Sequence, residues 1–118
     1  MPGVSIHVVD VAHGVIAAGL EIALFAVKPD APPQLIAQGR AGANGLLEHP
    51  ALASTFATGT HRAVFQVGAY YRDRGEPLPR VPFLDVVTYD FGIADPAQHY
   101  HLPFKFTPWG YSCFRGGA

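Results

Sequence analysis

The sequence predicts an all-β sandwich of seven to eight short strands with one short helix. Thirteen glycines and eleven prolines divide the chain into short segments, and these segments are rich in the β-branched and aromatic residues that pack well in sheets. Only residues 68–74 favour a helix, because their basic end runs into Gly75, and glycine commonly ends helices. Many short strands with a single helix are typical of a β-sandwich.

The expected strands lie between these breaks. Residues 20–27 place Leu20, Ile22 and Leu24 on one face, as a half-buried strand requires. In the strand after residue 59 we expect His61 on the more loosely packed face. Residues 13–19 are predicted to form a turn-bearing connection. The predicted strands are 5–10, 20–27, 34–41, 60–67, 83–90, 99–106 and 111–114.

Length and composition limit the classes of function. A chain of 118 residues fits one domain, residues 1–118, because two domains would each be too small for a core. Apolar residues make up 49% of the chain, charged residues 14%, and the net charge is −1. Such a composition is typical of a globular protein with little electrostatic reach, so no nucleic-acid partner is expected.

The chain also carries information about its compartment. Cys113 is the single cysteine and has no intramolecular partner for a disulfide, which is compatible with a reducing compartment. The first residues lack a basic segment followed by an apolar run, because His7 and Asp10 interrupt the only candidate. No stretch approaches the roughly 20 apolar residues that cross a bilayer. We therefore expect a soluble, cytoplasmic protein with no membrane partner.

Motifs with strict spacing rules are missing from the sequence. It contains neither the P-loop pattern nor a G-x-G-x-x-G after a strand, so no nucleotide cofactor is expected. It contains no H-E-x-x-H or C-x-x-C zinc pattern. Cys113 lies between Ser112 and Phe114, as expected for a packed, inert strand thiol, and no G-x-S-x-G turn surrounds Ser112.

The histidines carry the strongest chemical signal. His99 and His101 share one face of a predicted strand, and His7 lies in the middle of an apolar alternating strand. A polar group in that position needs a partner. With His7 as a third ligand the pair could bind zinc or copper, whereas the simpler interpretation is an imidazole that is hydrogen-bonded within the sandwich. We expect no metal and no other cofactor.

Two long segments resemble a known family. The opening S-I-H-V-V-D-V-A-H-G-V-I-A-A-G-L-E-I-A-L-F is similar to the first strands of transthyretin-like proteins. The segment H-Y-H-L-P-F-K-F-T-P-W-G-Y-S-C-F-R-G-G resembles the end of the 5-hydroxyisourate hydrolase branch, which reads H-Y-H-[VIL]-P and then S-P-[YW]-G-Y-S-T-Y-R-G-S. The resemblance implies two four-stranded sheets with a short helix, a homotetramer with channels between its dimers, and ring-opening hydrolysis of a small heterocyclic substrate in purine breakdown.

Four site residues of that branch are retained. His7 matches the histidine of the first strand, and His101 matches the second histidine of H-Y-H; the resemblance implies that both are catalytic. Arg115 and Gly116 match the Arg-Gly of the terminal tetrapeptide that lines the channel. Histidine suits proton transfer because its ordinary pKa is near neutrality. The resemblance thus predicts a histidine acid/base pair, with Arg115 or backbone donors stabilising the oxyanion.

Three positions depart from the branch. Leu46 stands where an active-site arginine is expected, Phe114 replaces a tyrosine, and Gly117 replaces a serine. These changes remove a permanently charged fork of donors and two hydroxyl groups. Arg40 is a candidate replacement for the missing charge. Besides 5-hydroxyisourate hydrolysis, two alternatives therefore remain: a diverged enzyme acting on a less anionic lactam, and a ligand-binding protein without catalysis.

Overall fold

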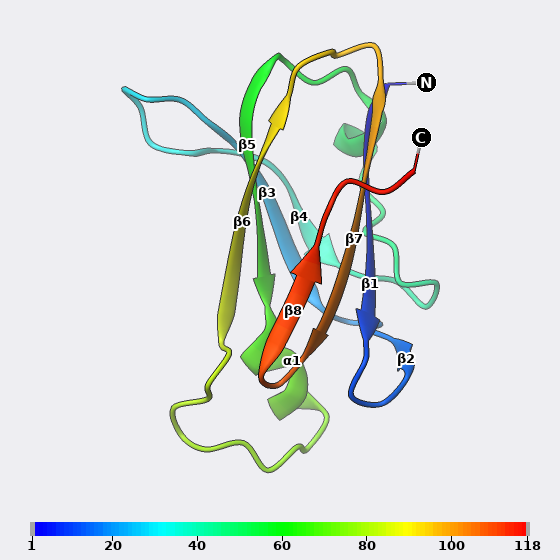
Figure 1. The fold of residues 1–118 in the computed structure, drawn as a ribbon, viewed down its shortest axis with the longest axis vertical. Helices are drawn as coiled ribbons and strands as arrows, with labels where there is room; N and C mark the ends of the chain where they lie inside the picture. Colours follow the sequence, from blue (N-terminus) through cyan, green and yellow to red (C-terminus); the bar gives the residue numbers. More distant parts are fainter. Residues whose placement is uncertain (1, 118) are drawn as a thin grey trace.

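The computed structural model describes residues 2–117 and has two four-stranded sheets that face each other (Figure 1). The first sheet has the order β2-β1-β7-β8, with β1 Gly3–Asp10, β2 Val15–Ile16, β7 His99–Thr107 and β8 Gly110–Cys113. The second has the order β4-β3-β5-β6, with β3 Glu21–Val27, β4 Gln34–Arg40, β5 Gly59–Gln66 and β6 Val86–Ile93. The predicted all-β sandwich is confirmed.

The core lies between the two sheets and follows the alternation read from the sequence. Leu20, Ile22 and Leu24 are all fully buried, as predicted. Phe65 of the second sheet stacks on Phe104 of the first, with ring centroids 3.8 Å apart. Because both rings are fully buried, truncation of either to alanine is expected to cost about 3–5 kcal/mol.

The first sheet joins the two ends of the chain. Strand β1 pairs in parallel with β7, whereas the other strand pairs are antiparallel. In this register Ser5 lies opposite His101, and His7 lies opposite Pro103. Figure 1 shows β1 and β7 side by side near both termini. The pairing therefore makes neighbours of the two histidine-bearing segments, although they are more than ninety residues apart in sequence.

The predicted α-helix is also confirmed, within one residue at each end, and it is the only one among residues 2–117. It spans Val67–Asp73 and lies at one end of the sandwich (Figure 1). Gly75 follows with φ +75°, a left-handed conformation in which a Cβ would be strained. A short 3₁₀ turn, Pro50–Ala53, and the two-residue strand β2 were not expected. In the described chain, no helix is long and apolar enough to cross a membrane.

The start of β6 was predicted wrongly. The strand begins at Val86 rather than at residue 83, and Phe83 is 82% exposed in the preceding loop. The backbone carbonyl of Asp85 instead accepts a hydrogen bond of 2.9 Å from the amide of Gly68 at the start of α1. The aromatic residue and its apolar neighbours resemble a strand in sequence, but this segment packs its backbone against the helix.

The face assigned to His61 was wrong as well. His61 is 2% exposed and shares the buried face of β5 with Ala63 and Phe65, as the two-residue period of a strand requires. It packs between Phe56 and Phe91, and its Nδ1 donates to the carbonyl oxygen of Gly59 at 3.1 Å. Aromatic packing and one local hydrogen bond therefore compensate for burial of the imidazole.

Candidate active site

Four polar side chains gather on the outer face of the first sheet. Ser5 and His7 extend from β1, and His99 and His101 extend from β7; all four are partly exposed. The intervening residues of both strands are buried in the core. Because the strands are parallel and in register, the strand alternation alone places all four on one surface.

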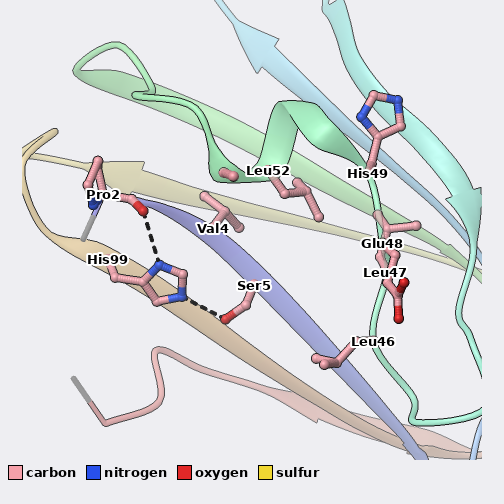
Figure 2. Close-up of a pocket in the computed structure, with 10 residues that line it drawn as sticks. Pro2, Val4, Ser5, Leu46, Leu47, Glu48, His49, Leu52 and His99 are labelled. Atoms are coloured by element: carbon pink, nitrogen blue, oxygen red, sulfur yellow. Dashed lines mark hydrogen bonds between the residues drawn. The ribbon is translucent and has the colours of Figure 1, made fainter.

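Ser5 lies at the centre of this group. Its Oγ is 2.8 Å from Nε2 of His99 and 2.6 Å from Nδ1 of His101. Nδ1 of His99 in turn contacts the carbonyl oxygen of Pro2 at 3.4 Å, so that His99 lies between Pro2 and Ser5 (Figure 2). The sequence analysis did not single out Ser5. Its position two residues before His7, hence on the same face, was the available signal.

His7 is positioned by a turn that packs against β1. Its Nε2 donates to the carbonyl oxygen of Asn44 at 3.1 Å, since a carbonyl only accepts. The carbonyl of Gly45 accepts from the amide of Val8 at 2.9 Å and so anchors the turn. Gly45 has φ +79°, and a Cβ there would lie 3.0 Å from Nε2 of His7. Only glycine fits this close approach without strain.

Leu46 lies beside His7. The two residues form an isolated antiparallel bridge, and the amide of Leu47 donates to the carbonyl of Ile6 at 3.2 Å. Leu46 also lines a cavity of about 480 Å³ whose wall is mainly apolar and includes Ser5 (Figure 2). The position at which the resemblance places an arginine is therefore adjacent to the histidine group, and it presents an aliphatic side chain there.

The C-terminal segment runs along β7 next to His101. The amide of Gly116 donates to the carbonyl oxygen of His101 at 2.7 Å. A Cβ on Gly116 would lie 2.7 Å from Cδ2 of His101, so a larger residue at 116 would force the imidazole to shift. At Gly117 a Cβ would meet no atom within 4 Å. The backbone could thus carry a serine at 117 without a steric clash.

Arg115 contacts side chains and backbone near the start of β7, whereas Phe114 is partly open to solvent. The guanidinium of Arg115 lies 3.9 Å from the ring centroid of Tyr100 and donates to Oε1 of Gln98 and to the carbonyl of His99 at 3.1 and 3.2 Å. Phe114 is 44% exposed. Both hydrogen bonds of Arg115 come from its Nη2.

Arg40 is held elsewhere. Its Nη1 contacts the carbonyl oxygen of Gly19 at 3.4 Å and lies 3.8 Å from a carboxylate oxygen of Asp73, at the end of α1. The side chain is well exposed, and Arg40 is not part of the cavity wall. The structure therefore does not bring Arg40 to the histidine group, and its candidacy as a replacement for the missing arginine gains no support.

Comparison with known proteins identifies the family of the chain. The model of the HIUase/Transthyretin family matches residues 4–116. The chain belongs to this family. A 5-hydroxyisourate hydrolase 2 of Rhizobium meliloti is 42% identical over 111 residues, which cover 93% of this chain and 92% of that protein. A 5-hydroxyisourate hydrolase of Pseudomonas aeruginosa is 40% identical over 93% of this chain and 87% of its own.

Solved structures show the same family resemblance. An (S)-allantoin synthase superposes with a TM-score of 0.89 at 32% identity; the match covers 98% of this chain and only 43% of that longer one. The 5-hydroxyisourate hydrolase of Klebsiella pneumoniae superposes with a TM-score of 0.79 at 25% identity, over 99% of this chain and all of the other. The chain thus spans less than half of the synthase and the full length of the hydrolase.

Within this group of side chains, His101 has a lowered pKa. Burial lowers the pKa of His101, and the neighbouring charges of His7 and His99 lower it further. The imidazole is therefore neutral at neutral pH, with an electron pair available to accept a proton.

The surroundings of the other histidines and of the lone thiol bear on two further kinds of catalytic group. Among residues 2–117, no three His, Cys, Asp or Glu side chains are placed to hold a metal ion together. Ser5 gives both His99 and His101 a hydrogen-bond partner, so neither ring needs a metal to be satisfied. Burial raises the pKa of Cys113 to about 11, so the thiol is protonated at neutral pH.

Proposed function

We propose that this chain hydrolyses 5-hydroxyisourate, opening its ring at an amide bond. The observation that carries the proposal is the placement of His7 and His101 on neighbouring strands of one open surface, where Ser5, the hydrogen-bond partner of His101, lines a cavity. Family members with 40–42% identity over most of the chain are named for this activity. His7 and His101 are the positions that the resemblance identifies as catalytic.

The geometry supports general-base catalysis by His101. Its neutral imidazole takes a proton from water while the water oxygen attacks the ring carbonyl carbon. The same proton then passes to the ring nitrogen as the carbon–nitrogen bond breaks, so the imidazole ends the cycle neutral. His7, the second member of the acid/base pair, carries its proton on Nε2. Such proton transfers contribute about 10²–10⁴ in rate.

The oxyanion of this reaction has a weaker partner than the family pattern provides. Leu46 offers no donor, and Arg115 is engaged with Gln98 and Tyr100. Loss of one oxyanion donor costs about 10²–10³ in kcat. We therefore expect turnover that is slower than in a member with the arginine, and Arg115, next to the glycine that contacts His101, is a candidate source of positive charge.

The assembly belongs to the proposal as well. We infer a cytoplasmic homotetramer, a dimer of dimers, in which the outer face of β1 and β7 borders a channel between subunits. The partly exposed histidines of this face support it, because they need a second surface to exclude water from the substrate. Small-angle scattering should report a tetramer. A stable monomer at micromolar concentration would remove the channel.

A direct assay tests the activity. Purified full-length protein is mixed with freshly generated 5-hydroxyisourate, and loss of substrate is compared with its spontaneous decay. We expect catalysis at the lower end of the common range of about 1–10³ s⁻¹, with His101→Ala as the matched control. Wild-type protein that does not accelerate the decay would refute the proposed function.

A second candidate rests on the apolar character of the cavity. Its wall beside Leu46 is mainly hydrocarbon, and in the C-terminal segment Phe114 presents an exposed ring without a hydroxyl. These features favour a less anionic heterocyclic lactam as the substrate. Turnover of neutral lactams without turnover of 5-hydroxyisourate would establish this alternative, whereas binding of either compound without turnover would indicate a ligand-binding protein.

A further inference from the structure

A chain of three hydrogen bonds leads from Pro2 to His101. It runs from the carbonyl of Pro2 to Nδ1 of His99, from Nε2 of His99 to Oγ of Ser5, and from Oγ of Ser5 to Nδ1 of His101 (the first two are drawn in Figure 2). A carbonyl oxygen can only accept, which sets the direction of the first bond. Nδ1 of His99 must therefore carry a proton.

This direction propagates through the chain. In its neutral form the ring of His99 has one N–H and one acceptor nitrogen, so with the proton on Nδ1 its Nε2 is the acceptor. The Ser5 hydroxyl must then donate its only proton to His99. Its oxygen remains an acceptor, and Nδ1 of His101, 2.6 Å away, has to be the donor. His101 is thus left with its proton on Nδ1 and an electron pair on Nε2.

We propose that Ser5, backed by His99, is a positioning residue that holds His101 in the tautomer whose Nε2 is free to accept a proton. The hydroxyl orients one edge of the imidazole, and the close backbone of Gly116 confines the opposite edge at Cδ2. No hydrogen bond from Nε2 of His101 is found among residues 2–117. This inference deepens the proposed function, on which its catalytic meaning rests.

The arrangement completes the proton balance of the hydrolytic step. Water gives one proton to Nε2 of His101 as its oxygen bonds to the ring carbonyl carbon. The imidazolium that forms still donates its Nδ1 proton to the Ser5 oxygen in a hydrogen bond. The positive charge of the ring strengthens this bond. The proton on Nε2 of His101 then passes to the ring nitrogen of the substrate as the carbon–nitrogen bond breaks. In the opposite tautomer Nε2 would already be protonated and could not take the proton from water.

The tautomer can be measured without any substrate. Two-bond ¹H–¹⁵N correlation spectra distinguish the two neutral forms of each imidazole, and His101→Ala identifies the His101 signals among the six histidines. In wild-type protein we expect the proton of His101 on Nδ1. Ser5→Ala removes the acceptor, so the Nε2-protonated form should appear, and kcat should fall by about 10² with little change in KM.

Ser5→Thr is the matched control. It keeps the hydroxyl, and the cavity beside Ser5 has room for the added methyl group. We expect the wild-type tautomer and a kcat within a few-fold of wild type. His99→Phe keeps a ring but removes the acceptor for the Ser5 proton, which frees the hydroxyl to donate to His101. This variant should also show the Nε2-protonated form, although His99 takes no part in the chemistry.

The possible outcomes separate this inference from the proposed function. An Nε2-protonated His101 in wild-type protein would overturn the role of Ser5, whether or not the protein opens 5-hydroxyisourate. An unchanged tautomer in both Ser5→Ala and His99→Phe would also overturn it. Wild-type protein with the expected tautomer but no turnover would support the positioning role and refute only the proposed substrate.

Discussion

Strand β1 carries a polar cluster on each of its faces, and the two clusters differ in kind. On the outer face, Ser5 and His7 lie at an open surface. On the inner face, Asp10 is fully buried and accepts hydrogen bonds from the hydroxyls of Tyr71 at 2.7 Å and Tyr70 at 3.2 Å. Nδ1 of His13 adds a third donor at 2.8 Å.

We call the inner cluster closed because the hydrogen-bond partners of Asp10 all lie within the fold. Within residues 2–117, no buried side-chain nitrogen or oxygen lacks a hydrogen-bond partner. Burial alone would raise the pKa of Asp10, but the hydrogen bonds from Tyr71, His13 and Tyr70 outweigh it and lower the pKa below 3.8. The outer cluster ends instead at Nε2 of His101, which has an unused electron pair. A closed polar cluster stabilises the fold, whereas an open one is available for chemistry.

The largest expected effect is on turnover at the open cluster. His101→Ala should lower kcat by about 10²–10⁴, because it removes the group that transfers the proton, and His7→Ala, which removes the other member of the proposed pair, should lower kcat by about 10² or more. If the two residues act as a unit, the double variant should cost little more than either single one. Steady-state kinetics with 5-hydroxyisourate measures this. Full activity in either single variant would exclude that histidine from catalysis.

The closed cluster should show the opposite response. Asp10→Ala leaves the Tyr70 and Tyr71 hydroxyls without their acceptor, and loss of one member of a buried, charged cluster costs about 3 kcal/mol or more. Urea unfolding measures the loss, with His7→Ala as the control that should stay near wild-type stability. Equal destabilisation by both variants would contradict the distinction between the clusters.

The sequence predicted the fold better than the site. Alternation identified Leu20, Ile22 and Leu24 as core, because burial imposes a two-residue period that the sequence records directly. The start of β6 escaped prediction, since Phe83 is apolar yet exposed in a loop whose backbone packs on the helix. No local pattern distinguishes such a residue from a buried one.

Long-range register explains what was missed at the site. Ser5 becomes important only because the pairing of β1 with β7 places Ser5 opposite His101. The sequence of either strand alone does not determine this register. Arg40 was attractive because it is close to Leu46 in sequence. The intervening turn separates the two, and Arg40 contacts Gly19 and Asp73 instead.

A smaller gain is expected from restoring charge to the open cluster. Leu46→Arg places a guanidinium beside His7, where the forked donor can stabilise the developing oxyanion. We expect kcat with 5-hydroxyisourate to rise about tenfold, part of the 10²–10³ that an oxyanion donor is worth. Leu46→Met is the uncharged control. Turnover that stays at the wild-type level or below would favour the less anionic substrate, because a partly desolvated arginine without an anion to bind has only a desolvation cost.

The smallest effect is the pH dependence of the closed cluster. His13 lies between Asp10 and Glu76, with Nε2 2.5 Å from the Glu76 carboxylate. The hydrogen bond and the charge of Asp10 raise the pKa of His13 above 6.5, and Glu76 adds to this. Stabilisation by a group with a raised pKa is complete below the unfolded value and is lost as pH rises through the folded value. Protonated His13 should therefore stabilise the fold most in acid.

The Tm difference between wild type and His13→Ala tests this sign. It should be largest between about pH 5 and pH 6, where Asp10 is still ionised because its pKa lies below 3.8, and it should shrink toward about pH 9. His13→Gln keeps a neutral donor near Asp10 and serves as the control, whose Tm should approach that of wild type only at high pH. A difference that is constant across this range would show that His13 acts through its neutral hydrogen bond alone. The closed cluster would then owe its stability to the two tyrosine hydroxyls and not to charge.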